Sequence, residues 1–193
     1  MKQQVDNLKN KKVIGFDMDG VIIDHSARKV ALAKKMGFKI KRQETPSDII
    51  KDLIPEPEYK KLQFMLYNDP KASLSSSLMS GVKPALSRLQ KNGTPFFLIS
   101  RRQEHGLSKK LLAKHELWPK YFNEENTFFV KEVADKETTA KKLGITHYID
   151  DEQKVLDALV SVKNKFLFDP LEAFKNPPKY WRIKSWKEIL RLI

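Results

Sequence analysis

Short apolar runs recur along most of this chain, separated by longer stretches in which apolar and polar residues mix at helical spacing. Each run is only four or five residues long and ends at, or directly before, a polar or charged residue, which is typical of strands buried in a sheet. The runs predict strands at Val13–Asp17, Pro95–Ile99, Thr127–Val130, His147–Asp150 and Lys165–Phe168.

The segments between these runs predict helices, several with recognisable ends. They span Val82–Lys91, Gln103–His115, Lys136–Leu143, Gln153–Val162 and Trp186–Leu192. Asp135 is a candidate N-cap for the third, and Ser185 with Glu188 forms a capping-box pattern before the last. Strands that alternate with helices predict an α/β fold: a three-layer, Rossmann-like parallel sheet covered by helices on both faces.

Residues 25–80 interrupt this alternation. Three segments read as helices without a convincing strand: residues 25–38, 45–54 and 55–69. Thr45 followed by Pro46 resembles a cap with proline at the first helical position, and residues 71–81 read as a return linker. The prediction is a Rossmann-like core of residues 1–24 and 81–193, with a small helical cap inserted at 25–80. Tyr59, Leu62, Phe64 and Leu66 are expected to form the core of the insertion.

Composition limits the number of domains, the kinds of metal site and the cellular location to be expected. The 193 residues suit one domain with an insertion, and the absence of cysteine excludes disulfides and thiolate metal sites. The first twelve residues lack the apolar region of a secretory signal, and no apolar run is long enough to span a membrane. We therefore expect a cytoplasmic protein that is not in a membrane. Nothing in the sequence indicates an oligomeric state.

The formal net charge is +13, which attracts anions such as nucleic acid or phosphorylated metabolites. The lysines are spread along the whole chain and form no long basic run. This distribution favours a solvated lysine-rich surface over a nucleic-acid interface.

Two carboxylates follow the first predicted strand, in the segment "FDMDGV". Ligands of parallel α/β sheets bind beyond the carboxyl ends of the strands, where Asp17 and Asp19 are expected. An EF-hand is excluded because Arg28 stands where that loop needs its bidentate glutamate. A solvated turn remains open, but two carboxylates at the end of a buried strand favour a Mg²⁺ site.

Other predicted strands also end at side chains that can bind a metal or a phosphate. The segment "FFLIS" ends at the hydroxyl of Ser100, "HYIDD" ends at Asp150 and Asp151, and Lys136 lies at the start of the helix before that pair. Carboxylates, a hydroxyl, a lysine and a hard cation are together suited to phosphoryl transfer.

These four motifs, in this order, resemble those of the haloacid dehalogenase-like superfamily of phosphohydrolases. The resemblance implies that Asp17 is the nucleophile that forms an aspartyl-phosphate and that Asp19 is the general acid and base. It also implies that Ser100 binds a phosphoryl oxygen and that Lys136 neutralises phosphate charge. Mg²⁺ would be held by Asp17, the backbone carbonyl of Asp19, and Asp150 or Asp151. The segments "LFDPLEAFKN" and "RIKSWKEI" near the end of the chain also faintly resemble the tail of the deoxyribonucleotidase-type branch.

Several assignments remain open at this point. Lys131 competes with Lys136 as the lysine that neutralises phosphate, and Arg101 and Arg102 are candidates for binding the substrate. Asp24 and His25 are expected to serve as a hinge or as helix caps.

The function expected is Mg²⁺-dependent hydrolysis of a small phosphate monoester, with nucleoside monophosphates as the first class to consider. One alternative is a phosphatase that processes nucleic-acid ends, for which the positive charge is the only support. The other is an inactive binding module on this fold, disfavoured because no signature residue is missing.

Overall fold

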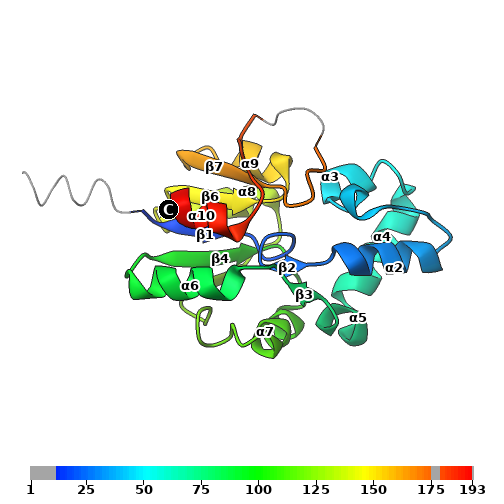
Figure 1. Ribbon diagram of the computed structural model, residues 1–193, viewed down its shortest axis with the longest axis horizontal. Coiled ribbons are helices and arrows are strands. Elements are labelled where there is room, and N and C mark those ends of the chain that lie inside the picture. The colour runs from blue at the N-terminus through cyan, green and yellow to red at the C-terminus, as the bar shows by residue number, and fades with distance from the viewer. Residues whose placement is uncertain (1–11, 175–178, 193) are drawn as a thin grey trace, which may run out of the picture.

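The computed structural model describes residues 12–174 and 179–192, so the first eleven residues, on which the expectation about a secretory signal rests, lie outside it. Within these ranges six parallel strands form one sheet in the order β5-β4-β1-β6-β7-β8 (Figure 1). The strands are β1 Ile14–Phe16, β4 Phe96–Ser100, β5 Thr127–Phe129, β6 His147–Asp150, β7 Asn164–Phe168 and β8 Trp181–Ile183. The predicted α/β parallel sheet is confirmed, and β8 is an additional edge strand.

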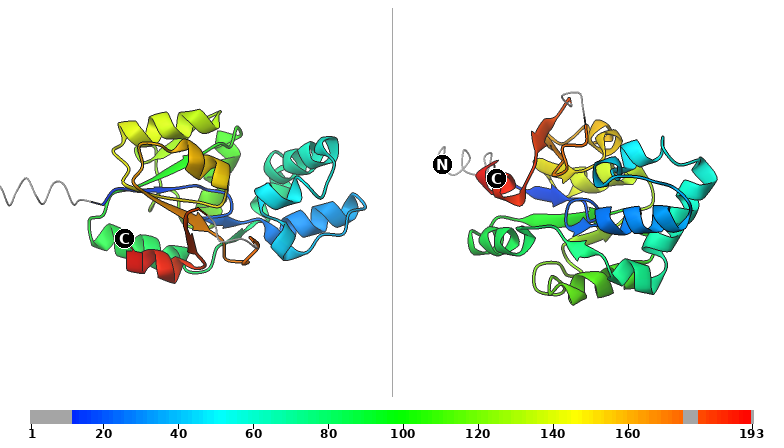
Figure 2. Two further views of the ribbon diagram at one scale, coloured as in Figure 1. Left: turned by 90° about the horizontal axis from the view of Figure 1, so that it is seen from above. Right: turned by 45° about the vertical axis from the view of Figure 1, so that its right-hand side comes forward.

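Helices cover both faces of the sheet. One face carries α6 Val82–Lys91, α7 His105–Lys114 and α10 Trp186–Leu192, and the other carries α8 Val133–Lys142 and α9 Gln153–Ala158 (Figure 2). The packing follows from helical spacing. In α6, for example, Val82, Ala85, Leu86 and Leu89 lie on one side and are buried against the sheet. The three-layer arrangement is therefore built by amphipathic helices on a doubly buried sheet.

Some predicted helix ends were wrong. Helix α8 begins at Val133 because Glu132 is its N-cap in a capping box with Asp135, which lies at the third helical position instead of capping the helix. Helix α9 stops at Ala158, four residues before the predicted end. Helices α6 and α10 have the predicted bounds. The early start of α8 places Lys136 inside its first turns.

The insertion consists of helices that lie to one side of the sheet (Figure 1). Its elements are α2 Ser26–Lys35, the short 3-10 helix η1 Arg42–Glu44, α3 Ser47–Ile50, α4 Glu56–Tyr67 and α5 Pro70–Leu74. An antiparallel pair, β2 Ile23–Asp24 with β3 Ser77–Leu78, joins it to the core. The segment predicted as a return linker, residues 71–81, contains regular structure, namely β3 and most of α5.

The insertion has an apolar core of its own, which includes Leu62 and Leu66 as predicted, with Tyr59 packed against it. Phe64 was wrongly assigned to this core, since its side chain is 65% exposed. Pro46 is at the N-cap of α3 instead of the first helical position, and the Thr45 hydroxyl donates to the Arg42 carbonyl instead of capping α3. None of the helices described is long and apolar enough to cross a membrane.

Strand order determines where the site lies. In the sheet, β4 and β5 lie on one side of β1, and β6 and β7 lie on the other side. The direction in which successive strands are added therefore reverses between β1 and β6. Ligands bind at such a topological switch point, outside the carboxyl ends of the strands. Asp17 follows β1 and Asp150 is the last residue of β6, so two carboxylates lie at this switch point.

Candidate active site

A tight loop after β1 presents the first two aspartates. The Met18 carbonyl accepts from the amides of Ile22 and Ile23, and the Gly20 amide donates to the Ile23 carbonyl. Gly20 has φ +85°, and a Cβ there would lie 2.2 Å from Asp151 Oδ2. Only glycine meets both constraints without strain, so the loop can pack closely against the fourth motif.

Lys136 contacts a carboxylate of the first motif and one of the fourth. Its Nζ donates to Asp17 Oδ1 at 2.5 Å and to Asp150 Oδ2 at 2.8 Å. The lysine is 1% exposed, and the two acids raise its pKa well above the ordinary value despite the opposing effect of burial. Asp17 Oδ2 accepts from the Asp19 amide at 2.9 Å, and Asp150 Oδ1 accepts from the Glu152 amide at 2.9 Å. Both carboxylates are therefore held in fixed orientations.

Asp17, Asp150 and Asp151 form a cluster in which one oxygen from each lies within 4.8 Å of the others. Burial raises the pKa of Asp17 to about 7, opposed by Lys136 and reinforced by Asp150 and Asp19. Burial and the neighbouring acids also raise the pKa of Asp151 well above its ordinary value, and burial raises that of Asp150. Crowded, partly desolvated carboxylates of this kind are destabilised as anions unless a cation joins them. An oxygen-only donor set fits Mg²⁺, which prefers such ligands.

Asp19 lies in a different electrostatic environment from this cluster. Arg102 donates to both of its oxygens, from Nε at 2.9 Å to Oδ2 and from a terminal nitrogen at 2.8 Å to Oδ1. His25 Nε2 donates to Oδ1 at 2.6 Å. Burial alone would raise the pKa of Asp19, but Arg102 and His25 outweigh it and hold the pKa well below its usual range. Asp19 is therefore ionised in this conformation.

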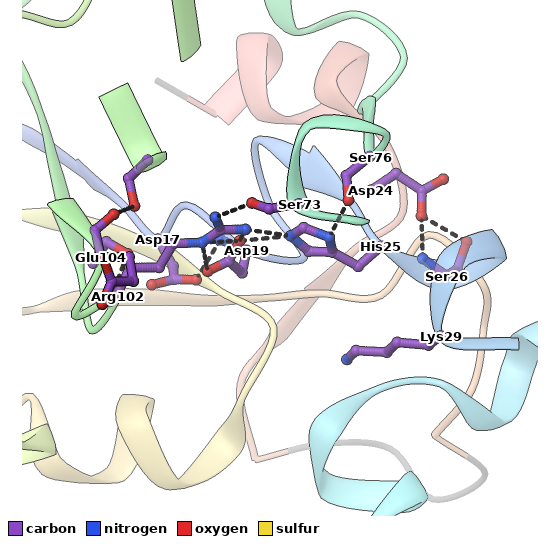
Figure 3. A network of polar contacts seen from close by, with 12 residues as sticks. Asp17, Asp19, Asp24, His25, Ser26, Lys29, Ser73, Ser76, Arg102 and Glu104 are labelled. Carbon is purple, nitrogen blue, oxygen red and sulfur yellow. Dashed lines mark hydrogen bonds and ion pairs between the residues drawn. The ribbon is translucent and has the colours of Figure 1, made fainter. Parts of the chain in front are cut away.

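The same contacts connect Asp19 to the insertion (Figure 3). Arg102 also donates to Ser73 Oγ of α5 at 3.0 Å, and its guanidinium lies 5.0 Å from the centre of the Tyr67 ring. His25 Nδ1 pairs with Ser76 Oγ at 2.7 Å. His25 occupies the N-cap position of α2 but makes no capping bond, so the expectation of a capping role was wrong for its side chain. Asp24 does accept from the Ser26 amide, as a capping residue would.

The remaining candidates fall into two groups. Ser100 is fully buried at the end of β4, where its Oγ accepts from the Arg102 amide at 3.3 Å. Arg101 lies beside the site and donates to Glu152 at 2.8 Å. Lys131 is exposed, and its backbone amide donates to Asp135. Of the two lysines left open by the sequence, Lys136 is the one that contacts Asp17.

Comparison with known proteins identifies the architecture. No family model and no curated protein matches the sequence. Solved structures do match: a haloacid dehalogenase-like protein of unknown function from Agrobacterium tumefaciens is 18% identical, with 94% of this chain and 96% of that one covered and a TM-score of 0.63. A HAD family hydrolase from Deinococcus radiodurans, with bound phosphate and sodium, is 17% identical, with 92% of this chain and 93% of that one covered and a TM-score of 0.61. The chain has the haloacid dehalogenase-like fold.

A third structure that matches is a predicted phosphoglycolate phosphatase from Haemophilus somnus, which is 15% identical, with 94% of this chain and 97% of that one covered and a TM-score of 0.58. The two coverages show that this chain spans nearly the full length of such a protein, insertion included. At this identity the comparison establishes the fold, and the chemistry has to be argued from the residues of this chain.

A cavity of about 310 Å³ lies between the strand ends and the insertion. Asp17, Asp19 and Asp151 line it from the core, together with Arg101 and Arg102. The insertion contributes Ser26, Lys29, Thr45, Pro46, Ser47, Gln63, Phe64, Tyr67 and Asn68. Five of the predicted site residues therefore border a space of small-molecule size between the core and the insertion.

Proposed function

We propose that the protein is a Mg²⁺-dependent phosphatase that hydrolyses a small phosphate monoester through an aspartyl-phosphate intermediate. The observation that carries the proposal is the placement of Lys136 between Asp17 and Asp150, with Asp151 completing a carboxylate cluster at the switch point of the sheet. A structural ion pair would not need a third carboxylate beside it, whereas a phosphoryl-transfer site needs a nucleophile, a cation and a metal position together.

In the first step a carboxylate oxygen of Asp17 attacks phosphorus, and the bond from phosphorus to the leaving oxygen breaks. Lys136 orients the attacking group and offsets part of the negative charge that the carboxylate and the phosphate bring together. Asp17, Asp150, Asp151 and the Asp19 carbonyl would hold Mg²⁺, which supplies further charge neutralisation and orientation when bound. Ser100 and Arg101 are proposed to contact phosphoryl oxygens.

Asp19 is proposed to protonate the leaving oxygen and then to take a proton from the water that hydrolyses the phosphoenzyme. Its ionised state beside Arg102 suits the second of these tasks. The first task needs a proton on the same carboxylate. An incoming phosphate dianion competes with Asp19 for the Arg102 guanidinium, and a carboxylate that loses its cation partner has a higher pKa. Substrate binding would thus convert Asp19 from a base into an acid.

The size of the cavity favours a small substrate over the alternatives. Its volume of about 310 Å³ lies at the lower end of the range for small-molecule sites, and residues of the insertion line part of it. The rest of a nucleic acid would have to lie outside this space, where the lysines are dispersed and form no long basic run. An inactive binding module would not need the acid pair of Asp17 and Asp19. Nucleoside monophosphates and phosphorylated small metabolites, including phosphoglycolate, form the panel to screen.

The test is phosphate release from such a panel, with Mg²⁺ and with a chelator. We expect activity on at least one small monoester that disappears with the chelator. The Mg²⁺ concentration needed for half activity should fall as pH rises from about 6 to about 8, because protons compete with the cation for Asp17, whose pKa is raised to about 7. Activity that is indifferent to the chelator, or release only from oligonucleotide ends, would contradict the proposal.

A further inference from the structure

A buried lysine in the insertion has no part in the mechanism described above. Lys29 lies in the first turn of α2, is 6% exposed and lines the active-site cavity. Its Nζ donates to the Thr45 carbonyl at 2.9 Å. None of the ion pairs among residues 12–174 and 179–192 includes Lys29. It is a buried ammonium whose direct partner is a neutral oxygen.

Such a group is costly to bury. Ammonium groups are nearly always paired when they leave water, because one carbonyl dipole replaces little of the lost hydration. Burial accordingly lowers the pKa of Lys29, while Asp151 and Glu152 oppose the effect from beyond ion-pairing distance. An anion inside the cavity would complete the coordination of this ammonium.

The position of Lys29 indicates which part of a ligand it would meet. Figure 3 shows its side chain extending from α2 toward the side on which Asp17, Asp19 and Arg102 lie. The other cations near the cavity already have carboxylate partners: Lys136 with Asp17 and Asp150, Arg102 with Asp19, and Arg101 with Glu152. Lys29 belongs to the insertion, whereas the attacking oxygen belongs to the core, so we expect Lys29 to meet the leaving group and not the reacting phosphate.

The rest of the insertion's cavity surface is uncharged and combines polar groups with the side chains of Pro46, Phe64 and Tyr67. Hydroxyls come from Ser26, Thr45 and Ser47 and amides from Gln63 and Asn68, and no carboxylate from residues 26–74 lines the cavity. A single positive charge among neutral hydrogen-bonding groups matches one negative charge on the ligand. A second phosphate, with up to two charges, would need more cations than this surface offers.

We propose that Lys29 binds a carboxylate on the leaving group, so that the preferred substrates are phosphate monoesters of small hydroxy acids. The proposal rests on the phosphatase function proposed above and narrows its substrate class. Lys29 is then a specificity-determining residue. It adds binding energy for acidic leaving groups and takes no part in bond breaking at phosphorus.

Matched substrates separate this role from a structural one. The first pair is 3-phosphoglycerate and glycerol 3-phosphate, and the second is 2-phosphoglycolate and 2-hydroxyethyl phosphate. Within each pair, the first ester carries a carboxylate at the position where the second carries a hydroxymethyl group. For the wild-type protein we expect kcat/KM to be higher for the acid in at least one pair. Lys29→Met should lower that acid-to-alcohol ratio by about tenfold to a hundredfold, the range for a lost hydrogen bond to a charged group.

Controls keep the result interpretable. Lys34→Met removes an exposed lysine from the same helix and should leave the ratio unchanged. Lys29→Arg keeps the charge and should retain most of the preference, which covers the case in which Lys29→Met does not fold. Equal losses on acid and alcohol, or a Lys29 dependence seen only with bisphosphates, would overturn the assignment. Activity on p-nitrophenyl phosphate without any acid preference would overturn it too while leaving the phosphatase function standing, whereas no phosphatase activity on any ester would remove both.

Discussion

Replacing Asp17 by asparagine is expected to lower kcat by more than about 10⁴-fold on every phosphate ester, because the amide cannot form the aspartyl-phosphate. The fold should survive the change. The amide oxygen of the new side chain can still accept a hydrogen bond from Lys136 or from the Asp19 amide, and one desolvated negative charge fewer then lies beside Asp150 and Asp151. Steady-state kinetics with circular dichroism spectra of both proteins would test this expectation.

The matched control is Asp52→Asn, which changes an exposed carboxylate just after α3 that is absent from the cavity lining. It should keep activity within a few fold. If Asp17→Asn retained a tenth or more of the wild-type rate, Asp17 would not be the nucleophile.

Asp19→Asn is expected to cost about 10² to 10⁴-fold in kcat/KM on alkyl phosphates, the usual contribution of a positioned acid or base. The loss should be much smaller, about tenfold, in the first step with p-nitrophenyl phosphate, whose leaving group needs little protonation. Burst kinetics would separate the two steps, because slow hydrolysis of the phosphoenzyme should let it accumulate in this variant.

Asp19→Asn also changes the environment of Arg102, and the same kinetic experiment measures that effect. In Asp19→Asn the guanidinium loses its anionic partner and becomes available to phosphate, so KM should fall while kcat falls further. Equal losses on alkyl and p-nitrophenyl esters in the first step would contradict the role of Asp19 as the acid.

The parts of the fold that sequence predicts well are those governed by local periodicity. Helix α6 shows its apolar face in its own residues, and β6 is bounded by polar residues on both sides, so both were located correctly. The two aspartates after β1 and the pair after β6 were recognisable because a parallel sheet gathers its strand ends at one edge. Lys136 was harder to choose over Lys131, because the decision depends on where α8 begins.

Other features depend on contacts between distant segments. Strand β8 is only three residues long and is defined by its pairing with β7. Phe64, by contrast, lies two positions from both Leu62 and Leu66, a spacing that puts it on the opposite face of α4. Helical periodicity itself therefore excludes Phe64 from the apolar face of this helix, and it lines the cavity instead. The contacts of Asp19 with His25 and Arg102 join residues up to 83 positions apart. No local pattern indicates such contacts, so they emerge only when the insertion is packed onto the core.

The central claim is that Asp17 carries the phosphoryl group during turnover. The direct measurement is rapid acid quenching of the wild-type protein during hydrolysis of its best substrate, followed by peptide mass spectrometry. The account predicts one added phosphoryl group on Asp17, absent without substrate and absent from the Asp17→Asn variant. Phosphate release with a phosphoryl group on another residue, or sustained release by Asp17→Asn, would contradict it.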